Sequence, residues 1–283
     1  MKHATATPTK KTAELLFPGM GTHVQLMVVG AGPALLQEGR RTIADFERRW
    51  CSVGPDSEVS RVNARAGQWT PVSADTFQLI QSAISAWRIT DGRFHPTARS
   101  AGGAIEIDVL TGAVRVAPGV QLDLGGIAKA HAADLVVSAL MANGASGALA
   151  NLGGDVRVAG EAPVPPAWQI DVANPATGDD LATFAVTEGA IITSTRVVRS
   201  WLTGDVAQHE LIDPATGMPA TSGLISVTIL AAQTVLAEVL AKAAYVAGPL
   251  VGAELATRFG ATGMLVHESG AVTYLPKVGS FLV

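Results

Sequence analysis

The sequence contains few charged residues and no dense basic segment. Only 16% of its 283 residues are charged, and the formal net charge is −4. Proteins that bind nucleic acid cluster lysine and arginine side chains to neutralise phosphates. The charge pattern therefore excludes a nucleic-acid-binding function.

Cysteine is nearly absent, and long apolar segments are absent altogether. Cys51 is the only cysteine, so the chain forms no internal disulfide, which fits a reducing compartment. The longest apolar runs, such as LISVTILAA (224–232), are far shorter than the roughly 20 residues of a membrane-spanning helix. The first residues, MKHATATPTKKTAELLF, contain no apolar core of a secretory signal. We therefore expect a soluble, cytoplasmic protein.

What the sequence does contain is enough apolar material for one large core, since 48% of its residues are hydrophobic. Apolar spacing predicts helices at 33–50, 75–90, 126–143, about 233–247 and 250–259. A strand is expected at 22–30, short strands between 148 and 231, and a closing hairpin at 263–275. Because strands and helices are grouped rather than strictly alternating, we predict an α+β fold with mixed or antiparallel sheets and flanking helices. A flexible segment, 1–14, is expected to precede a single domain, 15–283.

The segment QLDLGGIAKAH (121–131) is the first candidate for chemistry. A strand end, two glycines and a helix start bring free backbone N–H groups and the positive end of a helix dipole together. Lys129 lies in the first helical turn, where that dipole disfavours a cation, so a nearby anion would explain it. The alternative is a tight turn followed by a solvated lysine.

Two further segments allow a structural reading beside a functional one. The glycines of NLGGD (151–155) let a backbone or a flat ligand approach closely, or form a bend or bulge in a sheet. In HELIDPATGMP (209–219), His209 and Glu210 are titratable groups beside a strong turn signal. The structural reading of this segment is a turn in which Asp213 binds its own backbone.

The segment AEVLAKAAYVAG (237–248) is an apolar helix with one polar stripe. Glu238, Lys242 and Tyr245 fall within a narrow sector of the helix surface. An exposed Glu–Lys pair at this spacing contributes only about 0.3–0.5 kcal/mol and usually belongs to a broad polar face. This helix has no such face, so we favour a buried charged site.

Seven segments, taken in order, resemble the ApbE family of FAD:protein FMN transferases. They are GMGTHVQL (19–26), DSEVSRVN (56–63), TDGRFHPT (90–97), LDLGGIAKAHAAD (122–134), NLGGD, LIDPATGMP (211–219) and SVTILAAQTVLAEVLAKAAYVAG (226–248). The resemblance covers nearly the whole chain and implies a T-fold-type α+β architecture around a cleft that holds FAD. It also implies a Mg²⁺-assisted transfer of FMN from FAD to a Thr or Ser hydroxyl of a target protein, with release of AMP.

The resemblance assigns roles to individual positions. The carbonyl of Gly126 and the side chain of Glu238 match metal ligands. The FAD-contacting positions correspond here to Met20, Arg93, Phe94, His95, Asp123, Lys129 and Ile212.

The chain also departs from the family pattern. Glu210 stands where the family usually has His, with His209 one residue early, and either side chain is a candidate base. Ala241 replaces an Asp or Ser, and His95 lies where an acid commonly follows Phe. Lys242 replaces a metal-binding Thr.

A protonated amine does not ligate Mg²⁺, but it does neutralise phosphate charge. We therefore predict that the Lys242 amine occupies the metal's place, pairs with Glu238 and points at the diphosphate. These departures leave three functions open: an FMN transferase that uses Lys242 and either His209 or Glu210, an FAD-binding protein without transferase activity, and an FAD pyrophosphatase with water as the acceptor.

Overall fold

The computed structural model describes residues 10–97, 105–198, 200–203 and 206–283. Its centre is an eight-stranded sheet in which every pair of neighbours is antiparallel. In spatial order its strands are β1 (Thr12–Gly19), β2 (Thr22–Val29), β6 (Gly147–Leu152), β7 (Asp155–Gly160), β10 (Gly189–Thr195), β15 (Leu224–Ala231), β16 (Thr262–His267) and β17 (Val272–Tyr274).

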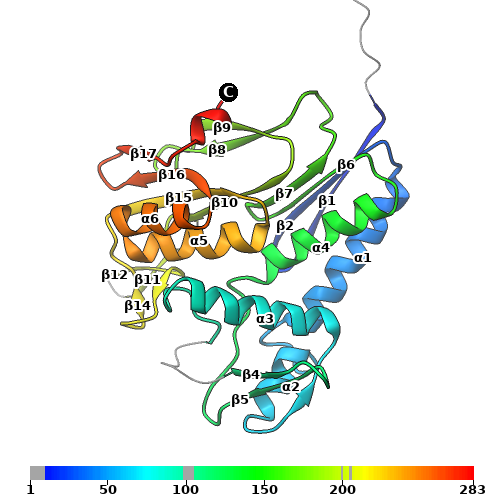
Figure 1. Ribbon diagram of the computed structural model, residues 1–283, viewed down its shortest axis with the longest axis vertical. Helices are drawn as coiled ribbons and strands as arrows, with labels where there is room; N and C mark the ends of the chain where they lie inside the picture. Colours follow the sequence, from blue (N-terminus) through cyan, green and yellow to red (C-terminus); the bar gives the residue numbers. More distant parts are fainter. Residues whose placement is uncertain (1–9, 98–104, 199, 204–205) are drawn as a thin grey trace, which may run out of the picture.

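Helices cover one face of this sheet (Figure 1). They are α1 (Pro33–Trp50), α4 (Ala128–Ala142), α5 (Thr234–Ala247) and α6 (Pro249–Arg258). The opposite face packs against the hairpin of β8 (Trp168–Ala173) and β9 (Asp180–Val186) and against the short 3₁₀ helix η1 (Val278–Ser280). Alternation along β10 illustrates the two layers, because Ile192 joins the core under α5 whereas Ile191 joins the core under β8 and β9.

A smaller group of elements lies at one end of the sheet (Figure 1). It consists of α2 (Glu58–Ala64), α3 (Ala74–Ile89) and a three-stranded sheet of β3 (Thr70–Pro71), β5 (Ala113–Val116) and β4 (Ile105–Asp108). Its apolar side chains belong to the same core as those of α1, α4 and β2. Two short hairpins, β11 (Ser200–Thr203) with β12 (Val206–His209) and β13 (Ile212–Asp213) with β14 (Met218–Pro219), precede β15.

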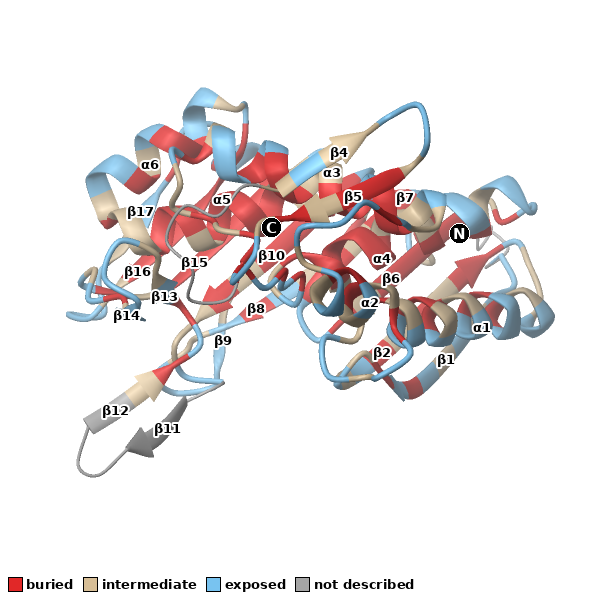
Figure 2. Cartoon of the chain, turned by 90° about the horizontal axis from the view of Figure 1, so that it is seen from below, coloured by how far each residue is buried: buried red, intermediate tan, exposed pale blue. Residues whose placement is uncertain are grey.

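The helix α5 is the most enclosed helix on the sheet, and its buried residues extend around most of its circumference (Figure 2). Against α6 the two backbones come close: a Cβ added at Gly252 would lie 2.6 Å from the carbonyl oxygen of Ala244. Only glycine fits at that position. α5 therefore has packed structure on both sides, the sheet on one and α6 on the other.

The α+β prediction is confirmed, and the five predicted helices are present with ends shifted by at most two residues. α4 begins at Ala128 rather than at Gly126, because the two glycines form the preceding turn. β1 was missed, and it begins at Thr12, inside the segment 1–14 that was expected to be flexible. Residues 1–9 lie outside the described residues. No helix in the described part of the chain has the length and apolar content needed to cross a bilayer.

Candidate functional site

Lys242 connects α5 to the turn before α4. Its ammonium lies 2.7 Å from Oε1 of Glu238, one turn earlier on α5, and donates a hydrogen bond of 2.8 Å to the carbonyl oxygen of Gly126. The Glu238 side chain is only 5% exposed and that of Lys242 22% exposed. The predicted pairing of Glu238 with Lys242 is thus present, and the amine also binds the carbonyl that the family resemblance marks as a metal ligand.

A second lysine–carboxylate pair lies beside the first. Lys129, in the first turn of α4, donates a hydrogen bond of 2.6 Å to Oδ2 of Asp155 at the start of β7. Both side chains are largely buried. The anion expected near Lys129 is therefore supplied by the chain itself.

The charges of both lysine–carboxylate pairs act on the pKa of Asp155. Burial raises the pKa of its carboxyl from 3.8 to about 6, and the negative charge of Glu238 adds to this rise. The ammonium groups of Lys129 and Lys242 act in the opposite direction. We call these four side chains, Lys129, Asp155, Glu238 and Lys242, the charge cluster.

Two tight hairpin turns lie next to each other near this cluster. Residues Met20 and Gly21 join β1 to β2, and Gly153 and Gly154 join β6 to β7, all four with positive φ. A Cβ at Gly153 would lie 2.3 Å from Oγ1 of Thr22. The glycines of NLGGD therefore form a hairpin turn against β2, and this turn starts β7 at Asp155. Met20 has φ of 50°, a backbone conformation that few non-glycine residues adopt.

The loop after α3 approaches the cluster through Phe94. A Cβ at Gly126 would lie 3.4 Å from the Phe94 ring and 3.3 Å from Nζ of Lys242, so a glycine suits this position. Arg93 instead donates a hydrogen bond to the carbonyl of Thr90, and Nδ1 of His95 lies 2.8 Å from the Thr97 hydroxyl. Burial lowers the pKa of His95.

Asp123, in the turn before Gly126, binds its own backbone. Its Oδ1 accepts a hydrogen bond of 2.9 Å from the N–H of Gly125. The side chain thereby orders the Gly-Gly turn.

Of the two predicted base candidates, His209 at the end of β12 contacts α5 through Tyr245. His209 packs edge-on against the ring of Tyr245, with ring centroids 5.8 Å apart, and Nδ1 of His209 is buried without a hydrogen-bond partner among the described residues. Burial lowers the pKa of His209. Glu210 is exposed. The structure thus joins His209 to Tyr245 and not to Glu238 or Lys242.

The turn that follows, at Asp213, has the structural role that the sequence allowed for it. Oδ1 of Asp213 accepts a hydrogen bond of 2.9 Å from the N–H of Ala215, so Asp213 stabilises its own turn. Ile212, just before it, pairs with Pro219 and is 38% exposed. It is available for an apolar contact, but the described contacts do not connect it to the charge cluster.

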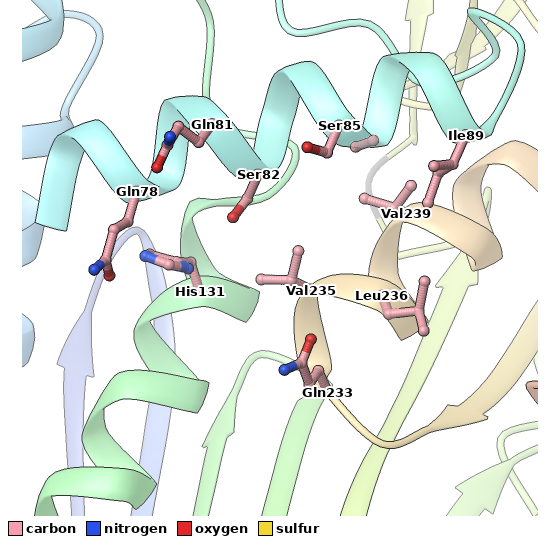
Figure 3. Close-up of a pocket in the computed structure, with 11 residues that line it drawn as sticks. Gln78, Gln81, Ser82, Ser85, Ile89, His131, Gln233, Val235, Leu236 and Val239 are labelled. Atoms are coloured by element: carbon pink, nitrogen blue, oxygen red, sulfur yellow. The ribbon is translucent and has the colours of Figure 1, made fainter. Parts of the chain in front are cut away.

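A groove of about 550 Å³ lies between α3, α4 and α5 (Figure 3). His131 lies two positions after Lys129, and Val239 directly follows Glu238, so the groove borders the charge cluster without including it. None of its 11 lining residues is Lys, Arg, Asp or Glu. A diphosphate needs cationic partners, so the charge cluster suits it better than this groove.

Magnesium is the metal that the family resemblance implies for this site. Mg²⁺ requires about six oxygen ligands at roughly 2.1 Å in octahedral geometry. The two oxygen donors expected here, on Gly126 and Glu238, are both engaged by the ammonium of Lys242. Across the described residues, no group of three or more His, Cys, Asp or Glu side chains could hold a metal ion. The donor set does not fit Mg²⁺.

Asp155 is the member of the charge cluster that sequence analysis missed. In NLGGD the two glycines are the feature that a sequence pattern singles out, and nothing local distinguishes the aspartate. The signal that could have found it is the unfavourable position of Lys129 in a first helical turn, which required an anion from elsewhere in the chain.

Comparisons with known proteins agree with this fold. The model of the ApbE family matches residues 20–265. The FAD:protein FMN transferase from Treponema pallidum is 36% identical over 142 residues, which are 46% of this chain and 39% of that relative. The enzyme of the same name from Klebsiella pneumoniae is 27% identical over 242 residues, which are 75% of each chain. The enzyme of the same name from Rhodobacter capsulatus is 31% identical over 57% of this chain and 31% of its own length. The chain thus spans well under two thirds of the Treponema and Rhodobacter relatives.

Solved structures give the same result at the level of the whole chain. The ApbE protein of Thermotoga maritima superimposes with a TM-score of 0.87 at 26% identity, over 96% of this chain and 99% of that one. The flavin transferase ApbE of Vibrio cholerae superimposes with a TM-score of 0.83 at 21% identity, over 96% and 100%. The chain belongs to the ApbE family.

Proposed function

We propose that this chain is an FAD:protein FMN transferase, which moves FMN from FAD to a Thr or Ser hydroxyl of a target protein and releases AMP. The observation that carries the proposal is the charge cluster, where the ammonium groups of two partly buried lysines flank the Gly-Gly turn at the start of α4. Two fixed cations suit a diphosphate. Support also comes from the family and from the names of the relatives.

The proposed step is a substitution at phosphorus with no change of oxidation state. The acceptor hydroxyl oxygen forms a bond to the flavin-side phosphorus of FAD. The bond from that phosphorus to the bridging oxygen breaks, and AMP leaves with the bridging oxygen. The hydroxyl proton passes to a base. Catalysis of this kind depends on positioning and on neutralising phosphate charge.

The proposed roles of individual residues combine the family resemblance with their places in the structure. Lys129 and Lys242 neutralise the diphosphate, while Asp155 and Glu238 fix the direction of the two amines. Met20, Phe94 and Ile212 offer apolar contacts to the flavin, and Arg93, His95 and Asp123 belong to the loops beside it. His209 and Glu210 are the candidates for the base. Because burial lowers its pKa, His209 is neutral near pH 7 and retains a basic nitrogen.

Two broader features belong to the same proposal. We propose one domain from β1 to the C-terminal residues, because strands from both ends of the chain contribute to the same sheet. The proposed location is the cytoplasm, which the single free cysteine, Cys51, fits.

The test is incubation of the purified chain with FAD and an acceptor protein that carries a reactive Thr. Covalent flavin on the acceptor, seen as in-gel fluorescence together with AMP release, is the expected result. AMP without labelled acceptor would indicate a pyrophosphatase instead. FAD binding without either product would indicate a binding protein. An acceptor in which the reactive Thr is changed to Ala serves as the control and is expected to stay unlabelled.

A further inference from the structure

The ammonium of Lys242 lies where a divalent cation would have to bind. Its two oxygen partners, on Glu238 and Gly126, come from different elements and lie 2.7 and 2.8 Å from Nζ. An ion bound to both oxygens would need to lie roughly 2.1 Å from each, within the space that Nζ fills. The amine and the metal therefore exclude each other.

The arrangement also has the features of a built cation site. Glu238 is almost completely buried, and a buried carboxylate requires a cationic partner. The backbone at Gly126 leaves space for the amine because it has no Cβ. A lysine ammonium has three N–H donors, and two of them bind Glu238 and Gly126. Glu238 and Gly126 are the two partners of Nζ among the described residues, so the third N–H of the ammonium can donate to a phosphate oxygen.

We propose that Lys242 is a built-in replacement for the metal ion, so that this chain binds the diphosphate of FAD without magnesium. The inference rests on the proposed function for the identity of the ligand. Lys129, held by Asp155, supplies the second positive charge of the same diphosphate site. The site then has fixed cations in the free protein and does not depend on the concentration of Mg²⁺.

The first measurement is FAD affinity, by fluorescence quenching, in the presence of EDTA and in excess Mg²⁺. For the unaltered chain the two dissociation constants are expected to agree within about twofold, since Mg²⁺ finds no oxygen site. A Mn²⁺ titration followed by electron paramagnetic resonance is expected to show no tightly bound ion in the FAD complex. Tight Mn²⁺ binding there, or affinity that rises about tenfold or more with Mg²⁺, would overturn the proposal.

The second measurement uses Lys242→Met, which removes the amine and keeps an apolar side chain. Loss of a charge-assisted hydrogen bond is expected to weaken FAD binding about 10- to 100-fold in EDTA. Because this change leaves Glu238 buried without a cation, the double variant Glu238→Gln/Lys242→Met is tested beside it, and a thermal melt checks that each is folded. Unchanged FAD affinity in a folded variant would overturn the proposal.

Lys11→Met, at an exposed lysine outside the site, controls for the change in net charge and is expected to bind FAD like the unaltered chain. The outcomes separate the two proposals. Magnesium-independent FAD binding without flavin transfer would contradict only the proposed function. If flavin is transferred but FAD binds only in the presence of Mg²⁺, the proposal of a metal-free diphosphate site is contradicted and the proposed function is not. Absence of FAD binding under both conditions would contradict both.

Discussion

Among the residues that the structure describes, Asp155 has the pKa that folding changes most. Its pKa rises from 3.8 to about 6 because its carboxylate is buried and lies near Glu238. Between these two pH values the folded chain holds the proton and the unfolded chain does not. The contribution of Asp155 to stability is therefore greatest below the lower value and falls as the pH rises through the higher one.

Asp155→Asn removes this titration. We expect the stability of the variant, relative to the unaltered chain, to improve as the pH rises from about 4 to about 7. The measurement is the free energy of unfolding in urea at a series of pH values. Asp179→Asn, at an exposed position, is the control and should show no such trend. A constant difference between Asp155→Asn and the unaltered chain across this range would contradict the assignment.

At the residue scale, sequence reasoning succeeded where helix geometry sets the contact. Glu238 and Lys242 are four residues apart on one helix, so their meeting follows from the helical repeat. The contacts of Lys129 with Asp155 and of Lys242 with Gly126 join residues far apart in the chain, and no local pattern specifies them. The resemblance, by contrast, makes the Gly126 carbonyl a metal ligand and implies that an amine in the metal's place would bind it, and the structure shows this hydrogen bond.

At the scale of elements, α4 supplies the cap of α5. The carboxylate of Asp134 accepts hydrogen bonds from the N–H and hydroxyl of Thr234 and from the N–H of Val235, with distances of 2.8–3.2 Å. Arg157 lies 3.3 Å from the same carboxylate. The start of the helix that carries Glu238 and Lys242 is thus fixed to the helix that carries Lys129.

Asp134→Ala leaves the first N–H groups of α5 without their cap. We expect a loss of about 1–3 kcal/mol of stability, measured by urea unfolding, because a helix cap and several partly buried hydrogen bonds disappear together. FAD binding should also weaken, because α4 with Lys129 and α5 with Lys242 would no longer be fixed to each other by Asp134. Glu254→Ala, at an exposed position of α6, is the control. Equal stability of the two variants would show that Asp134 does not act as a cap.

Long elements were predictable and short ones were not. α1 places Leu36, Ile43, Phe46 and Trp50 on its buried side, which is the periodicity that predicted it. β3 and β13 have two residues each, too few for any pattern to be recognised. α2 has seven residues and depends on a cap from Ser57, whose side chain accepts a hydrogen bond from the N–H of Ser60. Such elements are set by their tertiary surroundings.

At the scale of the molecule, the central sheet has apolar cores on both faces: two lie under the helices and one lies under β8 and β9. Ile191 and Ile192 are adjacent in β10 and point into opposite cores. The order of the strands also brings together segments from distant parts of the chain, which local sequence patterns do not specify. Loss of packing on either face should therefore destabilise the same sheet.

Ile191→Ala and Ile192→Ala test this coupling. Each should lower the free energy of unfolding by about 2–5 kcal/mol, since each removes a buried side chain. Urea unfolding followed by tryptophan fluorescence and by far-ultraviolet circular dichroism should show one coincident transition for both variants. Val251→Ala, at an exposed position of α6, is the control. Separate transitions from the two probes would indicate that the two cores unfold independently.

The close approach of Gly252 to Ala244 has a consequence for recognition. The backbone of α6 contacts α5 directly at Ala244, and β10 and β15 also pack against α5, so a shift of α5 on ligand binding would have to disturb these contacts. Its charges are preorganised, so association requires the incoming molecule and the neighbouring loops to adapt while the helix stays in place. The fold thus sets the positions of the Glu238 and Lys242 charges before a ligand binds.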